Sequence, residues 1–274
     1  MKKIIGAVLV LLGIGTGALV WKMHTDMPKA QEQLAAAAFL SKPAVLPENE
    51  ERLVVCSGAL EMTAPAVDGE LNVTLPSLKA ERLTERYENA GTADKPKYEW
   101  RKVYSGALGS RKIVGEARLG AFVLAPELLE TLPTPAFCQE FDGGELARAG
   151  LEMYGKLLGS ERYLSRSKVN VRGALRFSYR ISNLGGRQVT VKAVQKDGVL
   201  HPAPDQAPCV LEGILSREEV LKDSEENGIM GLVTGGVIAA LLLAAVLIPA
   251  RGILRLLLFL VPYLLAGGDV LWRA

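Results

Sequence analysis

The sequence has few of the residues from which catalytic centres and metal sites are usually built. Two histidines and three cysteines occur in 274 residues, with neither C-x-x-C nor H-x-x-x-H spacing, so a dedicated zinc site is not indicated. An excess of one charge is also lacking, since 32 basic and 30 acidic residues give a net charge of +2. This balance does not indicate a nucleic-acid partner. We expect a non-catalytic protein that binds no cofactor and no metal ion.

Apolar residues are concentrated at the two ends of the chain, whereas the middle has an ordinary composition. Residues 4–21 carry no charge and follow Lys2 and Lys3. As a helix they would rise about 27 Å, close to the ~30 Å of a hydrocarbon core. Trp21 and Lys22 are typical interfacial anchors, and no A-x-A cleavage pattern occurs there. We expect a retained transmembrane helix rather than a cleaved signal peptide.

Two further apolar segments, residues 228–250 and 256–272, lie near the C-terminus. The first is long enough to span a membrane, and the second is predicted to span it or to re-enter it. The positive-inside rule assigns residues 1–3 and the loop 251–255 to the cytoplasm, which leaves residues 22–227 outside it. The expected localisation is multi-pass, in a bacterial inner membrane with a periplasmic domain. The alternative is an endoplasmic reticulum or inner nuclear membrane with a lumenal domain.

The middle of the chain has the mixed pattern of an α+β domain rich in antiparallel strands. Strands are expected at residues 52–60, 71–75 and 97–104, and a helix is expected at residues 27–40. Strict alternation around a central turn predicts an antiparallel meander over residues 171–195. The expected fold is therefore an α+β extracytoplasmic domain with one N-terminal and two C-terminal transmembrane helices.

Two capping boxes mark the expected starts of further helices. Residues 142–145 (DGGE) predict a helix whose apolar face extends to Leu158, and residues 216–219 (SREE) predict a helix that continues to residue 227. In each case a short polar side chain precedes an acidic residue three positions later, so the two side chains satisfy the first free backbone N–H groups of the helix.

Cys56, Cys138 and Cys209 all lie in the region that is expected outside the cytoplasm, where disulfides are allowed. Because the number is odd, at most one internal pair forms, and the spacing does not say which. The alternative is three small buried apolar side chains.

Small residues recur at four- and seven-residue spacings in two of the apolar segments. Such rows let helix backbones approach closely within a membrane, so we expect helix packing and a homo-oligomer. The residues concerned are Gly6, Gly13, Gly17, Gly231, Gly235 and Ala239.

Several short stretches follow one another over most of residues 50–245: Arg52 to Val54, Gly58 to Leu60, Leu75 and Pro76, Lys79, Arg82, Glu85, Tyr87, Glu99 to Arg101, Arg176 to Tyr179, Val189 to Val191, Gly213 and Ser216 to Val220. In this order they resemble the transmembrane protein 43 (LUMA) family. The chain departs from the family at Glu88 and Asn89, where the family has Gln-Trp, and it has room for two apolar segments after the domain rather than three.

The resemblance implies a non-catalytic protein of endomembranes and the inner nuclear envelope, which self-associates and scaffolds other membrane proteins. The expected partners are the lipid bilayer, further copies of the chain and other membrane proteins. Two alternatives stay open. One is a membrane-tethered extracytoplasmic enzyme, which would depend on His201 and a carboxylate, and the other is a ligand- or lipid-sensing ectodomain, which would need an apolar cavity.

Overall fold

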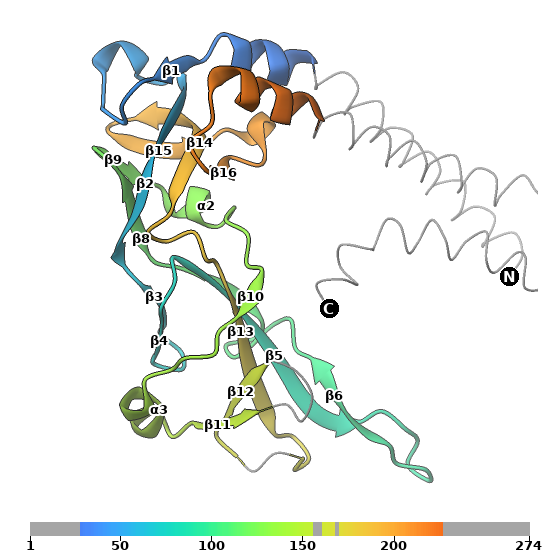
Figure 1. Ribbon diagram of the computed structural model, residues 1–274. Helices are drawn as coiled ribbons and strands as arrows, with labels where there is room; N and C mark the ends of the chain where they lie inside the picture. The colour runs from blue at the N-terminus through green and yellow to red at the C-terminus, as the bar shows by residue number, and fades with distance from the viewer. Residues whose placement is uncertain (1–27, 156–160, 168–169, 227–274) are drawn as a thin grey trace, which may run out of the picture. The chain divides into compact units, whose positions relative to one another are not determined.

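The computed structural model describes residues 28–155, 161–167 and 170–226 of the chain (Figure 1). These residues belong to two compact units. One unit is Ala37–Leu215, and the described part of the other consists of residues 28–36 and 216–226.

The first sheet of the larger unit closes on itself. Its hydrogen-bonded order is β1-β2-β8-β9-β15-β14-β16, and β14 also pairs with β2, so that β2, β8, β9, β15 and β14 form a ring. Closure is possible because β2 is long and uses its first half against β14 and its second half against β8. The strands are β1 (Ala38–Leu40), β2 (Leu53–Ala64), β8 (Glu116–Leu119), β9 (Phe122–Leu124), β14 (Gln188–Lys196), β15 (Val199–Pro202) and β16 (Val210–Glu212).

The interior of this ring is one apolar cluster. Every second residue of β14 contributes to it, because side chains alternate between the two faces of a strand, and Val189 and Val191 are fully buried there with Leu60 of β2 and Phe122 of β9. The short helix α2 (Pro126–Leu129) adds buried leucines to the same cluster. Two single 3₁₀ turns, η1 (Pro47–Asn49) and η2 (Pro204–Gln206), lie in its connections.

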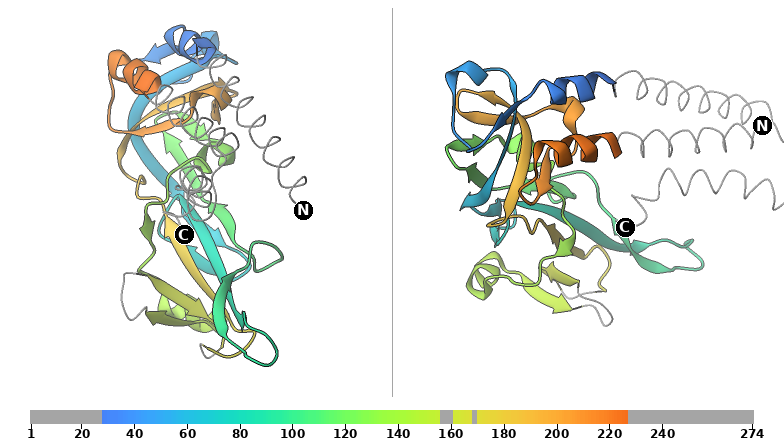
Figure 2. Two further views of the ribbon diagram at one scale, coloured as in Figure 1. Left: turned by 90° about the vertical axis from the view of Figure 1, so that its right-hand side faces the viewer. Right: turned by 45° about the horizontal axis from the view of Figure 1, so that its top comes forward.

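The second sheet is open and has the order β11-β12-β13-β5-β6 (Figures 1 and 2). One of its faces carries a second apolar cluster, to which the two-stranded sheet β3–β4 and helix α3 contribute. Its elements are β5 (Lys79–Asn89), β6 (Tyr98–Lys102), β11 (Glu152–Gly155), β12 (Arg162–Ser165) and β13 (Leu175–Ile181), with β7 (Arg111–Val114) beside β5, β10 (Ala136–Phe137) beside β13, β3 (Ala66–Asp68), β4 (Val73–Leu75) and α3 (Gly143–Ala149).

The smaller unit shows two helical segments, residues 28–35 and 217–226. The second capping box is confirmed, since the Ser216 amide donates to Glu219 Oε2 at 2.8 Å and the Glu219 amide donates to Ser216 Oγ at 3.3 Å. Arg217 Nη2 also donates to the carbonyl of Ala35 at 2.6 Å, which ties the two segments together.

The predicted fold class is wrong, because the described chain is mainly β with short helices. Residues 27–40 were expected to be one helix, but the helix covers residues 28–35 and β1 follows it. Of the capping box at residues 142–145, only the N-cap half is confirmed: the Glu145 amide donates to Asp142 Oδ1 at 2.8 Å, whereas the Glu145 carboxylate accepts from the amide and the hydroxyl of Thr74, both at 2.8 Å. Its helix stops at Ala149, because Gly150 takes a left-handed conformation that terminates helices.

The predicted meander over residues 171–195 is also wrong. β13 pairs with β5 in the open sheet, whereas β14 pairs with β2 in the ring. The segment between them is a crossing point and not a hairpin, because the Ser182 amide donates to Lys79 of one sheet and the Gly186 amide donates to Leu60 of the other.

The predicted multi-pass membrane architecture, with its localisation, is corrected as well. Among the residues that the structure describes, no helix is long and apolar enough to cross a membrane. The segments 4–21, 228–250 and 256–272 lie outside the described residues, together with the six small residues of the predicted packing rows.

Candidate functional site

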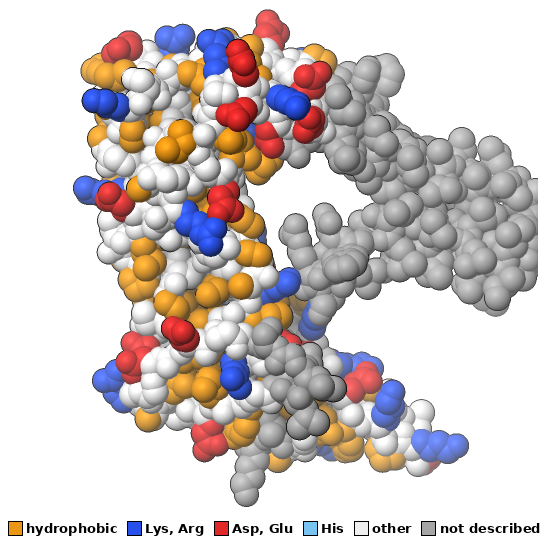
Figure 3. Space-filling view, in the orientation of Figure 1, with side chains coloured by type: hydrophobic (Ala, Val, Ile, Leu, Met, Phe, Trp, Pro, Cys, Tyr) orange, Lys and Arg blue, Asp and Glu red, His pale blue; other side chains and the backbone are white. Residues whose placement is uncertain are grey.

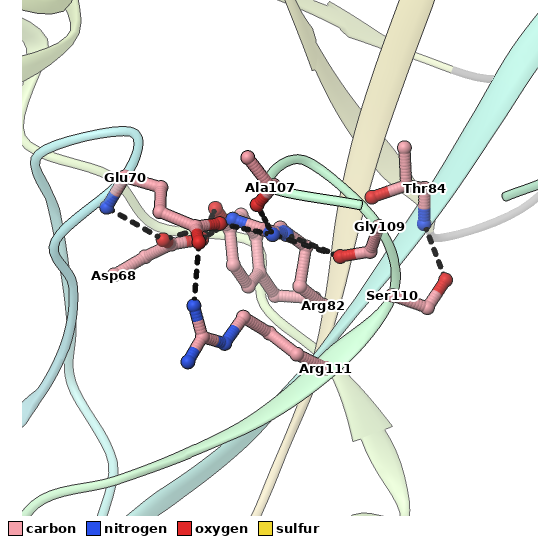
Figure 4. Close-up of polar contacts among 9 residues, drawn as sticks. Asp68, Glu70, Arg82, Thr84, Ala107, Gly109, Ser110 and Arg111 are labelled. Carbon is pink, nitrogen blue, oxygen red and sulfur yellow. Dashed lines mark hydrogen bonds and ion pairs between the residues drawn. The ribbon is translucent and has the colours of Figure 1, made fainter. Parts of the chain in front are cut away.

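The largest fully buried side chain among the described residues is Arg82, on the inner face of β5 (Figure 4). Its Nη1 donates to both carboxylate oxygens of Asp68, at 2.9 and 2.7 Å. Its Nη2 donates to Glu70 at 2.6 Å and to the carbonyl of Ala107 at 3.1 Å, and its Nε donates to the carbonyl of Gly109 at 3.2 Å. The guanidinium therefore has acceptors around its whole rim, as a buried cation requires.

Two more residues complete this group, which we call the Arg82 cluster (Asp68, Glu70, Arg82, Arg111 and Tyr179). Tyr179 Oη donates to Asp68 at 2.8 Å, and Arg111 Nη1 donates to Glu70 at 2.7 Å beside an open hollow of about 350 Å³. Burial and the negative charge of Asp68 raise the pKa of Tyr179, so the phenol stays protonated. Burial opposes the charged form of Arg82, but Glu70 and Asp68 outweigh it and raise the pKa of Arg82.

The Arg82 cluster joins strands that are far apart in sequence. Asp68 ends β3, Arg82 lies on β5 and Tyr179 lies on β13. Asp68 and Arg82 are each 1% exposed, so neither charge can reach a ligand from solvent. We assign the cluster a structural role, in which it fixes the β3–β4 hairpin on the open sheet.

A second arginine lies on the opposite face of the same sheet and is placed differently. The guanidinium of Arg176, on β13, lies 4.4 Å from the ring centroid of Trp100 on β6 and 4.1 Å from that of Tyr163 on β12. Its Nε donates to Glu85 on β5 at 2.7 Å. Four neighbouring strands thus each supply one side chain to a single stack, in which the cation contacts an aromatic ring on either side.

The stack continues from Trp100 onto the hairpin formed by β5 and β6. The ring of Tyr87 lies 5.2 Å from that of Trp100 and 5.7 Å from that of Tyr98. Figures 1 and 2 show this hairpin extending past the neighbouring strands of the sheet. We call the whole group the Arg176 surface (Glu85, Tyr87, Tyr98, Trp100, Tyr163 and Arg176).

The Arg176 surface remains accessible, in contrast to the Arg82 cluster. The Arg176 side chain is 19% exposed and that of Glu85 is 21% exposed, while Tyr98 is 41% exposed. Tyr163 is buried beneath the arginine and donates from Oη to Glu161 at 2.8 Å. Burial, followed by that hydrogen bond, raises the pKa of Tyr163. Tyrosine, tryptophan and arginine are the residue types that dominate protein interfaces, so this surface is the candidate functional site.

The residues singled out from the sequence are distributed over other parts of the molecule. Cys56 and Cys209 lie as free thiols in the core of the ring, and Cys138 lies as a free thiol in the core of the open sheet. His201 lies on β15, opposite Val194 of β14. Within the described ranges, no group of three His, Cys, Asp or Glu side chains could hold a metal ion.

The comparisons with family models, with curated proteins and with solved structures find no match to this chain. The function must therefore be argued from the geometry of the site.

Sequence reasoning named Arg82, Glu85, Tyr87 and Trp100 only as carriers of a resemblance, and it did not place them in clusters. Tyr163 had no signal at all, because it lies between two segments without clear periodicity. The alternation in β13 did identify Arg176 as an outward-facing residue, since it falls out of phase with the apolar positions. The aromatic residues that cover it come from strands whose pairing is not visible in the sequence.

Proposed function

We propose that this chain is a non-catalytic scaffold protein, which associates with copies of itself and holds other proteins together through the Arg176 surface. The observation that supports the proposal most directly is the stacking of the accessible Arg176 between Trp100 and Tyr163. A rigid group of aromatic rings around an ordered guanidinium loses little side-chain entropy on binding. Such a group is therefore suited to contact another protein surface.

The ion pair between Arg176 and Glu85 supports the same proposal. The carboxylate neutralises the guanidinium, so the surface as a whole carries little net charge and can be desolvated without leaving a single unpaired ion. Because the arginine is also held by Trp100, it is already ordered before a partner arrives. Tyr87 and Tyr98 extend the contact area along the hairpin.

Co-capture of two differently tagged full-length copies from cells tests this function. We expect the unaltered copies to be recovered together, and Arg176→Ala to reduce the recovery by at least about tenfold, as for residues at the centre of an interface. Arg187→Ala is the matched control, because Arg187 is a half-exposed arginine paired with Glu212 on β16 of the first sheet and contacts no aromatic ring in an interaction that the structure describes. Equal recovery with both variants would contradict the role of the surface, and no recovery of the unaltered copies would contradict the function.

A second candidate function is the binding of a small apolar ligand. A hollow of about 490 Å³, within the range of ligand pockets, is lined by Met62, Pro76, Ala136 and Ile181 among others. A fluorescent apolar dye such as anilinonaphthalene sulfonate should bind there, and Ala136→Trp should abolish its fluorescence if the hollow is the site. Unchanged fluorescence in that variant would contradict this candidate.

A further inference from the structure

β6 is the edge strand of the open sheet, and its outer side is a free edge in the part of the chain that the structure describes. Its inner residues can be identified from the hydrogen bonds at the two ends of the hairpin. The Ala90 amide donates to the Lys97 carbonyl at 2.7 Å, and the Val103 amide donates to the Thr84 carbonyl at 2.8 Å. Backbone direction alternates along a strand, so residues 97, 99, 101 and 103 face β5.

The backbone groups of Tyr98, Trp100 and Lys102 therefore point away from the sheet. This assignment agrees with the other strand of the hairpin, where Tyr87, opposite Trp100, exchanges backbone hydrogen bonds with residues 173 and 174 and not with β6. A free edge of this kind is a template for another strand.

The two residues between these positions, Glu99 and Arg101, each face a residue of the same charge on β5. Glu99 lies directly opposite Glu88, and Arg101 lies directly opposite Arg86. Like charges directly opposite one another destabilise a strand pair. The only ion pairs of Glu99 within the described residues are with its own strand neighbours, at 3.2 Å to Arg101 and 3.8 Å to Lys97. Figure 3 shows the hairpin with both signs of charge and hydrophobic side chains interspersed.

A second copy of the same strand would correct this pairing. In an antiparallel arrangement with Trp100 opposite Trp100, Glu99 of each copy lies opposite Arg101 of the other, and Tyr98 lies opposite Lys102. The three outward-facing residues of one strand then meet the three of the other, which allows about six inter-strand hydrogen bonds, two for each facing pair. The opposite charges attract and the tryptophan rings meet at the twofold axis.

The neighbouring registers are disfavoured by the same charges. The backbone groups of the two strands can form hydrogen bonds only in registers that place outward-facing residues, such as Tyr98, Trp100 and Lys102, opposite one another. Sliding the strands one step in one direction puts Glu99 opposite Glu99, and one step in the other puts Arg101 opposite Arg101. The charged residues that usually protect an edge from pairing thus select a single register.

We propose that two copies of this chain associate edge to edge through β6, antiparallel and with the twofold axis at Trp100. This inference rests on the proposed self-association and identifies its surface. The pairing joins the two open sheets into one and brings the two Arg176 surfaces together, because Trp100 is both the centre of the edge and the outer ring of the stack. The partner is a second copy because the charge pattern of the strand is complementary to itself.

A charge exchange tests the register in co-capture of two tagged full-length copies. Glu99→Arg should reduce recovery by at least about tenfold, because it places two arginines opposite each other in both halves of the interface. The double variant Glu99→Arg with Arg101→Glu should restore it. Glu99→Arg also removes the repulsion from Glu88 inside the hairpin, so its effect would not arise from loss of the hairpin. Glu212 is an exposed glutamate on β16 of the first sheet, and Glu212→Arg should have no effect on recovery.

Disulfide formation then tests the geometry directly. One tagged copy carries Glu99→Cys and the other carries Arg101→Cys, and the native cysteines are too buried to react, at 1–3% exposed. We expect a disulfide between the two differently tagged copies on mild oxidation, since residues of a non-hydrogen-bonded antiparallel pair have Cα atoms about 4.5 Å apart. Either copy alone should give little disulfide-linked product. If the unaltered copies are recovered together but neither the disulfide nor the charge exchange behaves as stated, the β6 pairing is wrong and the scaffold function stands with another contact. If the unaltered copies are not recovered together, both fail.

Discussion

Arg82 and Arg176 lie on adjacent strands of one sheet, and each is held by an ion pair, yet their surroundings are opposite. Arg82 faces the core and is enclosed by acceptors, whereas Arg176 faces outward and is enclosed by aromatic rings. The first arrangement satisfies every donor and leaves the side chain 1% exposed. The second keeps the side chain 19% exposed. The surroundings of each arginine, and not its ion pair, therefore separate the buried structural group from the accessible surface.

The largest expected effect on stability comes from removing the buried carboxylate partner of Arg82. Asp68→Ala leaves Arg82 without its bidentate partner and should lower the free energy of unfolding of the open sheet by about 3–5 kcal/mol. Urea-dependent labelling of the Cys138 thiol, which is buried in the same core, measures this in the full-length chain. Labelling of Cys56 in the ring is the internal control. A loss below about 1 kcal/mol would show that the cluster is not needed for the fold.

The next effect is a loss of stability at alkaline pH. Because the pKa of Tyr179 is raised in the folded protein, its phenolate is favoured in the unfolded chain. Stability from this group is complete below the ordinary tyrosine pKa of 10.0 and falls as the pH rises above it. The slope is about 1.4 kcal/mol per pH unit. Urea-dependent labelling of Cys138 at pH 8 and pH 11 measures the free energy of unfolding in the unaltered chain and in Tyr179→Phe. This free energy should depend less on pH in the variant. Identical slopes would contradict the assignment.

Substitutions on the outward side should affect stability less than assembly. Arg176→Ala removes two cation–π contacts and is expected to lower the free energy of unfolding by about 1–2 kcal/mol. Arg176→Lys keeps the charge but cannot cover both rings with a planar group, so it should resemble alanine in co-capture. The urea midpoint of Cys138 labelling measures the stability. Full assembly by the lysine variant would show that charge alone matters.

The smallest effect is expected at the edge of the buried cluster. Arg111 pairs with Glu70, but its side chain is 52% exposed, and exposed ion pairs contribute only about 0–1 kcal/mol. Arg111→Ala should therefore shift the urea midpoint of Cys138 labelling little, in contrast to Asp68→Ala. A shift as large as that of Asp68→Ala would mean that the exposed Arg111–Glu70 pair contributes as much to stability as the buried Arg82–Asp68 pair.

Local signals in the sequence predicted local structure. The N-caps at Asp142 and Ser216 and the strand at β2 were found, because each depends on residues a few positions apart. The extent of helix α3 was not found, although Gly150 is the expected terminator. Its apolar positions continued beyond the glycine and suggested a helix where the chain forms β11.

The pairing of distant strands could not be predicted. β13 and β14 look like a hairpin in sequence, but their partners are β5 and β2: Arg176 of β13 and Glu85 of β5 are 91 residues apart, and Thr190 of β14 and Ser57 of β2 are 133 residues apart. The Arg82 cluster and the Arg176 surface both depend on that pairing, since it brings together side chains from β3, β5, β6, β12 and β13. The alternation of β13 could show that Arg176 faces outward, but the rings of Trp100 and Tyr163 on either side of it appear only once the strand order is known.

The most direct test of the account measures stability and assembly together for three full-length proteins: the unaltered chain, Arg176→Ala and Arg187→Ala. Co-capture of tagged copies and the urea midpoint of Cys138 labelling are recorded on the same preparations. We predict that Arg176→Ala reduces co-capture by at least about tenfold, while its Cys138 thiol stays unlabelled in the absence of urea. Arg187→Ala should be unchanged in both measurements. Retention of full co-capture by Arg176→Ala, with the unaltered copies associated, would contradict the assignment of this surface to assembly.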